Sequence, residues 1–216
     1  DIADWKAESG ELRVAAGLDN QTARQLADHL GQYRRRINLL ELAHMNIDLS
    51  AAPTLSDALY GYPLTTLILN DVNLSSVGVD WFVHLPYLTV LEWKGGLHMS
   101  RRNVEHFFSQ MPTSLTKLSI SPGNVTYCSI APLMADMLTA CRQLVTFQLE
   151  RVPLTSSDIQ LVCTHLLDQN TNLTKLVLNY IALTSADLAV LAPNLPPSLL
   201  HLDLRDNHLD DSSVGL

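Results

Sequence analysis

The phrase Leu-x-x-Leu-x-Leu recurs seven times in this chain, with Ile, Phe or Trp replacing a few of the leucines. The copies begin at Ile37, Leu64, Leu88, Leu115, Leu144, Leu173 and Leu199, so successive copies lie 24 to 29 residues apart. Self-similarity at this period is typical of solenoids, in which each repeat adds one coil to a continuous core. The pattern therefore predicts a stack of similar coils.

Each phrase also predicts a short strand. Its fourth and sixth positions are two residues apart, so in an extended chain both side chains point to one face and the fifth points to the other. The fourth positions are Leu40, Leu67, Leu91, Leu118, Phe147, Leu176 and Leu202, and the sixth are Leu42, Leu69, Trp93, Ile120, Leu149, Leu178 and Leu204. We expect Leu176, Leu178 and Leu202 to be buried. A weaker copy at Leu12 and Val14 brings the number of coils to about eight.

The segments between the strands have a helical pattern of apolar residues. Four of them begin with a hydroxyl residue, at Thr22, Ser100, Ser157 and Ser185, which can accept hydrogen bonds from the first amides of a helix. Strand, turn, helix and turn then place a parallel sheet on one side and helices on the other. Strands stack about 4.8 Å apart but helices need about 8–10 Å, so we expect a concave sheet and convex helices.

These repeats resemble the leucine-rich-repeat family, and within it the ribonuclease-inhibitor-like class with long helical repeats. The resemblance runs from Leu12 to Leu209 and implies an α/β horseshoe, with residues 1–216 as a single solenoid domain. Only the last coil has the family's Asn at the ninth position, Asn207, so we expect the other turns to vary in shape. Neither end has an obvious polar cap, and we therefore expect the chain to be part of a longer protein.

Composition is that of a well-packed domain, with 47% hydrophobic and 17% charged residues. No stretch approaches the roughly 18 apolar residues that could cross a bilayer, so we expect no membrane insertion. The cysteines, Cys128, Cys141 and Cys163, form no Cys-x-x-Cys pair, and we interpret them as free core thiols. This favours a cytoplasmic protein. Four Asn-x-Ser/Thr sequons leave a secreted protein as an open alternative.

Motifs of known catalytic chemistry are absent from the sequence: there is no phosphate-binding glycine loop, no His-Glu-x-x-His and no Gly-x-Ser-x-Gly. We therefore expect no catalytic residue, no metal and no cofactor. His201, Asp203 and Arg205 alternate onto one face of the last strand, which we interpret as a solvated polar surface. The net charge of −8 disfavours a sequence-independent grip on nucleic acid, so the expected partner is another protein.

The candidate binding residues lie on the face of the sheet that points away from the core. A first group consists of the apolar residues Leu39, Ile68 and Val90 with a polar rim of Glu41, Asn70, Asp71, Glu92 and Lys94. A second group consists of Val177, Asn179, Tyr180, Asp203 and Arg205. All fifth positions, Val177 included, are expected to face solvent. Apolar anchors inside a polar rim are typical of protein-binding surfaces.

The sequence thus favours a non-catalytic recognition module that binds a protein on its concave sheet. One alternative is the substrate-recruiting or regulatory part of a larger enzyme, as in leucine-rich-repeat ubiquitin-ligase receptors or GTPase activators. Another is that the outward sheet face is simply solvated, because β-branched residues occur in strands for their strand propensity alone. The sequence does not separate these interpretations, and it leaves the oligomeric state open.

Overall fold

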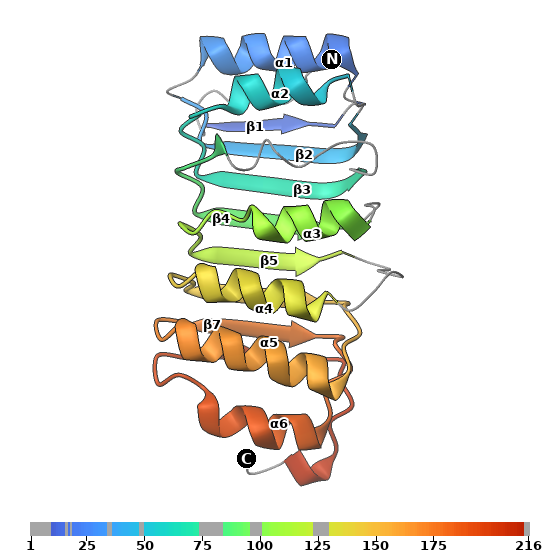
Figure 1. The fold of residues 1–216 in the computed structure, drawn as a ribbon, viewed down its shortest axis with the longest axis vertical. Helices are drawn as coiled ribbons and strands as arrows, with labels where there is room; N and C mark the ends of the chain where they lie inside the picture. Colours follow the sequence, from blue (N-terminus) through green and yellow to red (C-terminus); the bar gives the residue numbers. More distant parts are fainter. Residues whose placement is uncertain are drawn as a thin grey trace.

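A computed structural model describes residues 10–15, 17, 19–33, 36–47, 50–73, 84–95, 101–122 and 130–213. Within these residues the chain forms an α/β fold in which strands and helices alternate along the sequence. The helices lie along one face of a single sheet (Figure 1). The arrangement is compatible with a solenoid. Cys128 falls outside the described residues.

The sheet has eight strands among the described residues, all parallel and in sequence order. They are β1 (Glu11–Val14), β2 (Leu39–Asn46), β3 (Thr66–Asn73), β4 (Val90–Lys94), β5 (Lys117–Ser121), β6 (Thr146–Glu150), β7 (Lys175–Asn179) and β8 (His201–Asp203). Each strand pairs only with the strands before and after it in the sequence. The weak N-terminal repeat, which contains Leu12 and Val14, is confirmed as β1.

The register of the sheet follows the repeat phrase residue by residue. Every fourth position faces the fourth position of the next strand, from Leu12 and Leu40 in β1 and β2 to Leu176 and Leu202 in β7 and β8. Side chains at the fourth and sixth positions form the core: Leu176 and Leu178 are buried, as expected. Leu202 is not, because β8 is the edge strand and no described strand lies beyond it. Its side chain is 39% exposed, which corrects the expectation of burial.

The helices are α1 (Asn20–Gln32), α2 (Ala52–Leu59), α3 (Arg101–Ser109), α4 (Ala131–Ala140), α5 (Ser156–Gln169) and α6 (Ser185–Leu191), with short 3-10 turns η2 (Ala192–Asn194) and η3 (Asp211–Ser213). Of the four predicted hydroxyl caps, those of α5 and α6 lie earlier in the chain than expected, and Ser100 falls outside the described residues. Thr155 caps α5 and Thr184 caps α6, each in a reciprocal capping box with an Asp three residues later. Asp19 caps α1 in place of Thr22.

The turns that follow the strands are more uniform than the missing asparagines led us to expect. The eighth residue of each repeat, counted from the first residue of the phrase, lies two residues after the phrase ends. It adopts a left-handed backbone in six coils, with φ between 51° and 80°, at His44, Asp71, Gly95, Arg151, Tyr180 and Asp206. At Gly95 a side chain is also excluded by space, because a Cβ there would lie 2.9 Å from the backbone of Asp71. Pro122 occupies this position after β5, and its ring holds φ near −65°.

A line of threonine side chains joins neighbouring coils at the start of the strands. Thr65, Thr89 and Thr116, at the second position of the phrase, each donate a hydroxyl hydrogen bond to the backbone carbonyl at that position in the preceding coil, at 3.1–3.2 Å. Thr174 donates in the same way to Val145. These hydrogen bonds connect successive coils that have no asparagine at the ninth position.

The ends of the helices are held by buried polar groups. The Asn170 side chain is fully buried after α5, where its Oδ1 accepts from the Leu144 amide at 3.0 Å and its Nδ2 donates to the Leu166 carbonyl at 3.1 Å. The Tyr62 hydroxyl donates to the Leu30 carbonyl at the end of α1. The Leu166 carbonyl also accepts from the Asn170 backbone amide, so the Asn170 side chain adds a second hydrogen bond at the end of α5.

Candidate functional site

The face of the sheet opposite the helices carries the candidate residues. We call it the open sheet face and define it by the third, fifth and seventh residues of each repeat, counted from the first residue of the phrase. Asp71 and Tyr180, which are eighth residues, are the two candidates outside this definition. The described helices all lie on the other side (Figure 1). The open sheet face therefore has no secondary-structure element of the described residues packed on it.

The first group of candidate residues comes together on β2, β3 and β4. Leu39 pairs with Thr66 and Thr66 with Val90, while Ile68 lies between Glu41 and Glu92. Leu39, Ile68 and Val90 are all partly exposed. Neighbouring strands lie about 4.8 Å apart, so these three side chains form an apolar patch on three adjacent strands, with Thr66 between Leu39 and Val90.

Ion pairs hold the two glutamates on either side of Ile68. Glu41 meets Arg13 of β1, whose Nε lies 3.1 Å from Oε2. Glu92 meets two lysines, with Lys117 Nζ 2.5 Å from Oε1 and Lys94 Nζ 2.6 Å from Oε2. Burial works to raise the pKa of Glu92, but the hydrogen bonds from Lys117 and Lys94 outweigh it, and its pKa lies below the ordinary value. The rim of the patch is thus charged, and its two glutamates are each neutralised by a cationic side chain of the same face.

The remaining members of this group lie at the edge where the strands turn. Asn70 pairs with Lys94 in the register, and both follow Ile68 and Glu92 along their strands. Asp71 is exposed, and its Oδ2 lies 3.4 Å from Nδ1 of His44 in the preceding coil. The patch therefore has a polar border on this side as well.

Three members of the second group, Val177, Asp203 and Arg205, line an open hollow of about 580 Å³ on β6 to β8. Val177 lies in this hollow with the side chains of Gln148, Lys175 and Asp203 around it. Its side chain is only 2% exposed, so the expectation that it faces solvent is wrong. The cause lies in the register, because Gln148 and Asp203 are its direct neighbours in β6 and β8 and carry polar side chains that reach further from the strand.

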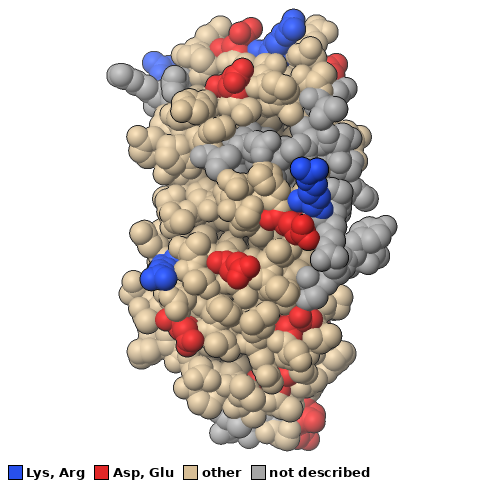
Figure 2. All heavy atoms as spheres, in the orientation of Figure 1, with Lys and Arg blue, Asp and Glu red and all other residues tan. Residues whose placement is uncertain are grey.

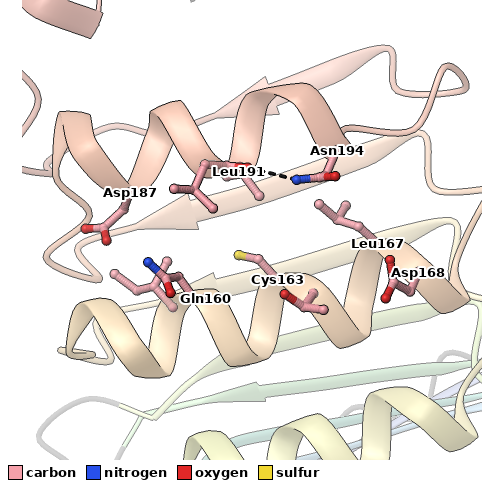
Figure 3. Close-up of a pocket in the computed structure, with 10 residues that line it drawn as sticks. Gln160, Cys163, Leu167, Asp168, Asp187, Leu191 and Asn194 are labelled. Carbon is pink, nitrogen blue, oxygen red and sulfur yellow. Dashed lines mark hydrogen bonds between the residues drawn. The ribbon is translucent and has the colours of Figure 1, made fainter.

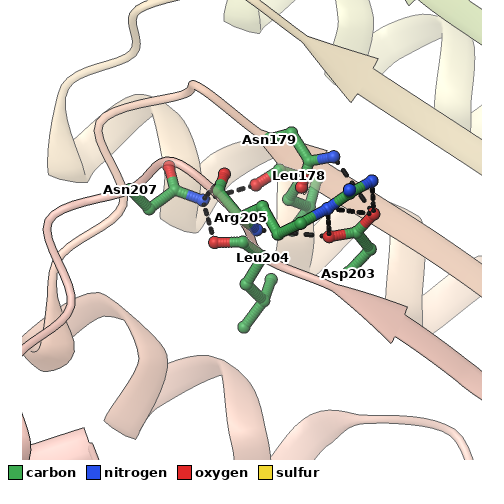
Figure 4. Close-up of polar contacts among 6 residues, drawn as sticks. All are labelled: Leu178, Asn179, Asp203, Leu204, Arg205 and Asn207. Atoms are coloured by element: carbon green, nitrogen blue, oxygen red, sulfur yellow. Dashed lines mark hydrogen bonds and ion pairs between the residues drawn. The ribbon is translucent and has the colours of Figure 1, made fainter.

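A hydrogen-bonded cluster closes one side of the hollow (Figure 4). The Arg205 guanidinium binds the Asp203 carboxylate with Nε–Oδ1 and NH2–Oδ2 distances of 2.9 and 2.7 Å, and Asn179 Nδ2 donates to the same carboxylate at 3.2 Å. The hydrogen bonds from Arg205 are the main reason why the pKa of Asp203 lies far below its usual range. Asn179 is itself buried, whereas Tyr180, next in the chain, is exposed.

The candidate residues thus form two separate sites rather than one. The first lies on β2 to β4 and the second on β7 and β8, with β5 and β6 between them. Three strand steps separate β4 from β7, which is roughly 14 Å. Sequence reasoning missed the ion-pair partners Arg13 and Lys117, although both occupy outward positions of neighbouring phrases.

Other kinds of site find little support in the described part of the chain. No group of three or more His, Cys, Asp or Glu side chains there could hold a metal ion. Cys141 and Cys163 are buried free thiols. None of the described helices has both the length and the apolar content that a membrane crossing requires. No protein-family model matches the chain, and no curated protein matches it either.

Proposed function

We propose that this protein is a leucine-rich-repeat solenoid of the ribonuclease-inhibitor-like class and that it acts as a recognition module for another protein. The partner binds on the open sheet face, over Leu39, Ile68 and Val90. The observation that carries the proposal is a partly exposed apolar patch on three adjacent strands, with ion-paired glutamates on both sides of its centre.

The chemistry of the patch suits a protein partner. Apolar area in the middle supplies affinity, and a polar rim excludes water and selects the partner. Glu41 and Glu92 already have cationic partners, so a ligand that covers Ile68 does not leave an isolated carboxylate without a counter-charge. Apolar anchors of the partner, such as a Leu or an aromatic ring, fit this centre.

The residues of the repeat support the same proposal. Asn207 occupies the family's ninth position and bonds the backbone of the preceding coil: its Oδ1 accepts from the Ile181 and Leu183 amides, at 3.1 Å each. In leucine-rich-repeat proteins of this class, the sheet is expected to be concave and to provide the binding surface. The proposal assigns that role to the open sheet face.

The test is to capture a partner with the purified chain, identify it by mass spectrometry, and measure its affinity for variants. Ile68→Asp places a charge at the centre of the patch and should weaken binding by at least about tenfold. Gln25→Asp is the matched control, because Gln25 is an exposed residue of α1 on the helical face. Equal affinity of both variants for the partner would refute the proposal. Thermal unfolding of both variants checks that each one is folded, so that weaker binding is not caused by unfolding.

A further inference from the structure

A pocket between α5 and α6, on the helical face, is independent of the proposed binding surface. It has a volume of about 260 Å³ and lies between the outer sides of the two helices. Figure 3 shows Cys163 and Leu167 on α5 facing Leu191 on α6 across the gap. This volume is below the usual range of about 300–1,000 Å³ for ligand pockets. The pocket therefore suits a small fragment or a single side chain.

The middle of the pocket is apolar. Ile159, Leu167, Val190 and Leu191 line it together with the Cys163 thiol. Burial, and secondarily the nearby Asp187 carboxylate, raise the pKa of Cys163 to about 12, so the sulfur is a neutral thiol at physiological pH. A protonated thiol packs as a small apolar group. This part of the pocket can contact hydrocarbon but offers no charge to a ligand.

The polar lining of the pocket consists of Gln160 and Thr164, which can donate or accept, and of two carboxylates and an amide that offer acceptors. Asp168 and Asn194 lie together at one end (Figure 3). Asp168 is exposed, and its carboxylate forms no hydrogen bond or ion pair with another described residue. Asn194 Nδ2 donates to the Val190 carbonyl at 2.9 Å, which leaves its Oδ1 as an acceptor. At the other end, Asp187 already accepts from the Thr184 amide and hydroxyl.

The electrostatics of the surroundings favour a cation. The pocket is lined by two aspartates and by no Lys, Arg or His. Helices α4, α5 and α6 together contain four Asp and no Lys or Arg. Figure 2 shows acidic side chains spread over this face of the molecule. An anion would meet like charge here, whereas a cation would meet a carboxylate that has no counter-charge among the described residues.

From these observations we propose that the α5–α6 pocket binds an alkyl chain that ends in an ammonium or guanidinium group. The cationic head lies beside Asp168 and the Asn194 carbonyl oxygen, and the alkyl chain lies along Leu167, Cys163 and Leu191. Lysine and arginine side chains have this construction, an apolar stem with a charged head. The same chemistry is found in free alkylamines.

The experiment is an NMR titration of the ¹⁵N-labelled protein with n-hexylammonium, with 1-hexanol and hexanoate as neutral and anionic counterparts. Hexylammonium should shift the amide signals of α5 and α6 in a saturable way, hexanol should bind more weakly, and hexanoate should not bind. Asp168→Asn should weaken hexylammonium binding by roughly two- to fivefold, because an ion pair at an exposed carboxylate is lost. Asp28→Asn, an exposed Asp of α1, is the matched control and should leave the affinity unchanged.

A second variant tests the apolar part of the pocket. Val190 is half-exposed on α6, so Val190→Phe can fill the pocket without disturbing the core, and it should abolish the shifts. A parallel titration with N-acetyl-lysine N-methylamide distinguishes the two sources of the ligand. If this compound binds more tightly than hexylammonium, the ligand of the pocket is a side chain of a partner protein. If hexylammonium binds more tightly, the ligand is a free amine. Hexylammonium shifts that persist unchanged in Asp168→Asn, or no saturable shifts at all, would overturn the proposal.

Discussion

Asn207 bonds the backbone of the coil before it, and its Nδ2 lies 2.6 Å from the carbonyl oxygen of Leu178. The same amide also donates to the Leu204 carbonyl at 2.8 Å, within its own turn (Figure 4). Its Oδ1 also accepts hydrogen bonds from two backbone amides of the preceding coil. This one side chain therefore bonds backbone groups of the preceding coil and of its own turn. It therefore fastens the last coil to the one before it.

Replacing Asn207 by Ala should destabilise the protein by roughly 1–3 kcal/mol, because partly buried backbone groups lose their partner. Chemical denaturation monitored by circular dichroism measures this cost. Asn172→Ala is the control, since Asn172 is exposed in the turn after α5, and it should change the free energy of unfolding by less than about 0.5 kcal/mol. Similar unfolding free energies for the two variants would show that the Asn207 bonds contribute nothing.

Leu178→Ala should cost roughly 2–5 kcal/mol, as is usual for a fully buried leucine. Leu202→Ala should cost clearly less, because Leu202 is partly exposed on the edge strand. The pair of variants is compared by denaturant unfolding under identical conditions. An equal cost at both positions would mean that the edge of the sheet is covered in solution.

Val177→Thr is expected to destabilise the protein by roughly 1–3 kcal/mol, since Val177 is buried under polar neighbours and the new hydroxyl loses contact with water. Val90→Thr makes the same chemical change at a partly exposed position of β4 and should cost less. Thermal melts of the two variants give the comparison. If Val177→Thr melted at the temperature of the parent, Val177 would be solvated.

The contribution of Asp203 to stability should depend on pH. Its pKa in the folded protein is lowered, chiefly by hydrogen bonds from Arg205, so the ionised carboxylate stabilises the fold above the unfolded pKa of about 3.9. That stabilisation is lost as the pH falls through the unfolded pKa towards the folded one. The difference in unfolding free energy between the parent and Asp203→Asn should be constant from about pH 7 to 5 and shrink below. A difference that does not change down to pH 3 would contradict the lowered pKa.

The two described cysteines should resist alkylation in the native protein. Burial raises the pKa of Cys141 to about 11, and the pKa of Cys163 is raised to about 12, so neither forms much thiolate at pH 8. Iodoacetamide treatment followed by peptide mass spectrometry should find both unlabelled in buffer and labelled in urea. Rapid native labelling of Cys163 would mean that its thiol is more exposed and more acidic than described.

The register of the sheet could be predicted from the sequence because the leucines alternate with outward residues and repeat at a fixed spacing. A one-residue slip would move every Leu from the core to the surface, so the pattern leaves a single solution. The apolar patch of Leu39, Ile68 and Val90 followed from the same register. These features depend only on the order of residues along each phrase.

The features that were not predicted depend on side-chain size and on helix packing. Val177 is buried by neighbours from two other strands, and a rule for one strand does not include them. The caps at Thr155 and Thr184 lie two residues and one residue before the predicted Ser157 and Ser185, because any of the adjacent hydroxyl residues can begin the same apolar pattern. The α5–α6 pocket arises from how two helices pack against each other, which the sequence pattern of each helix does not specify.

The one-by-one pairing of the strands determines how the molecule should respond to tension. β1 and β8 lie at opposite ends of the sheet, so a pull between them acts on every strand pair in series, and the weakest pair separates first. The molecule should extend in discrete steps, each releasing 24 to 29 residues, or roughly 80–100 Å of chain.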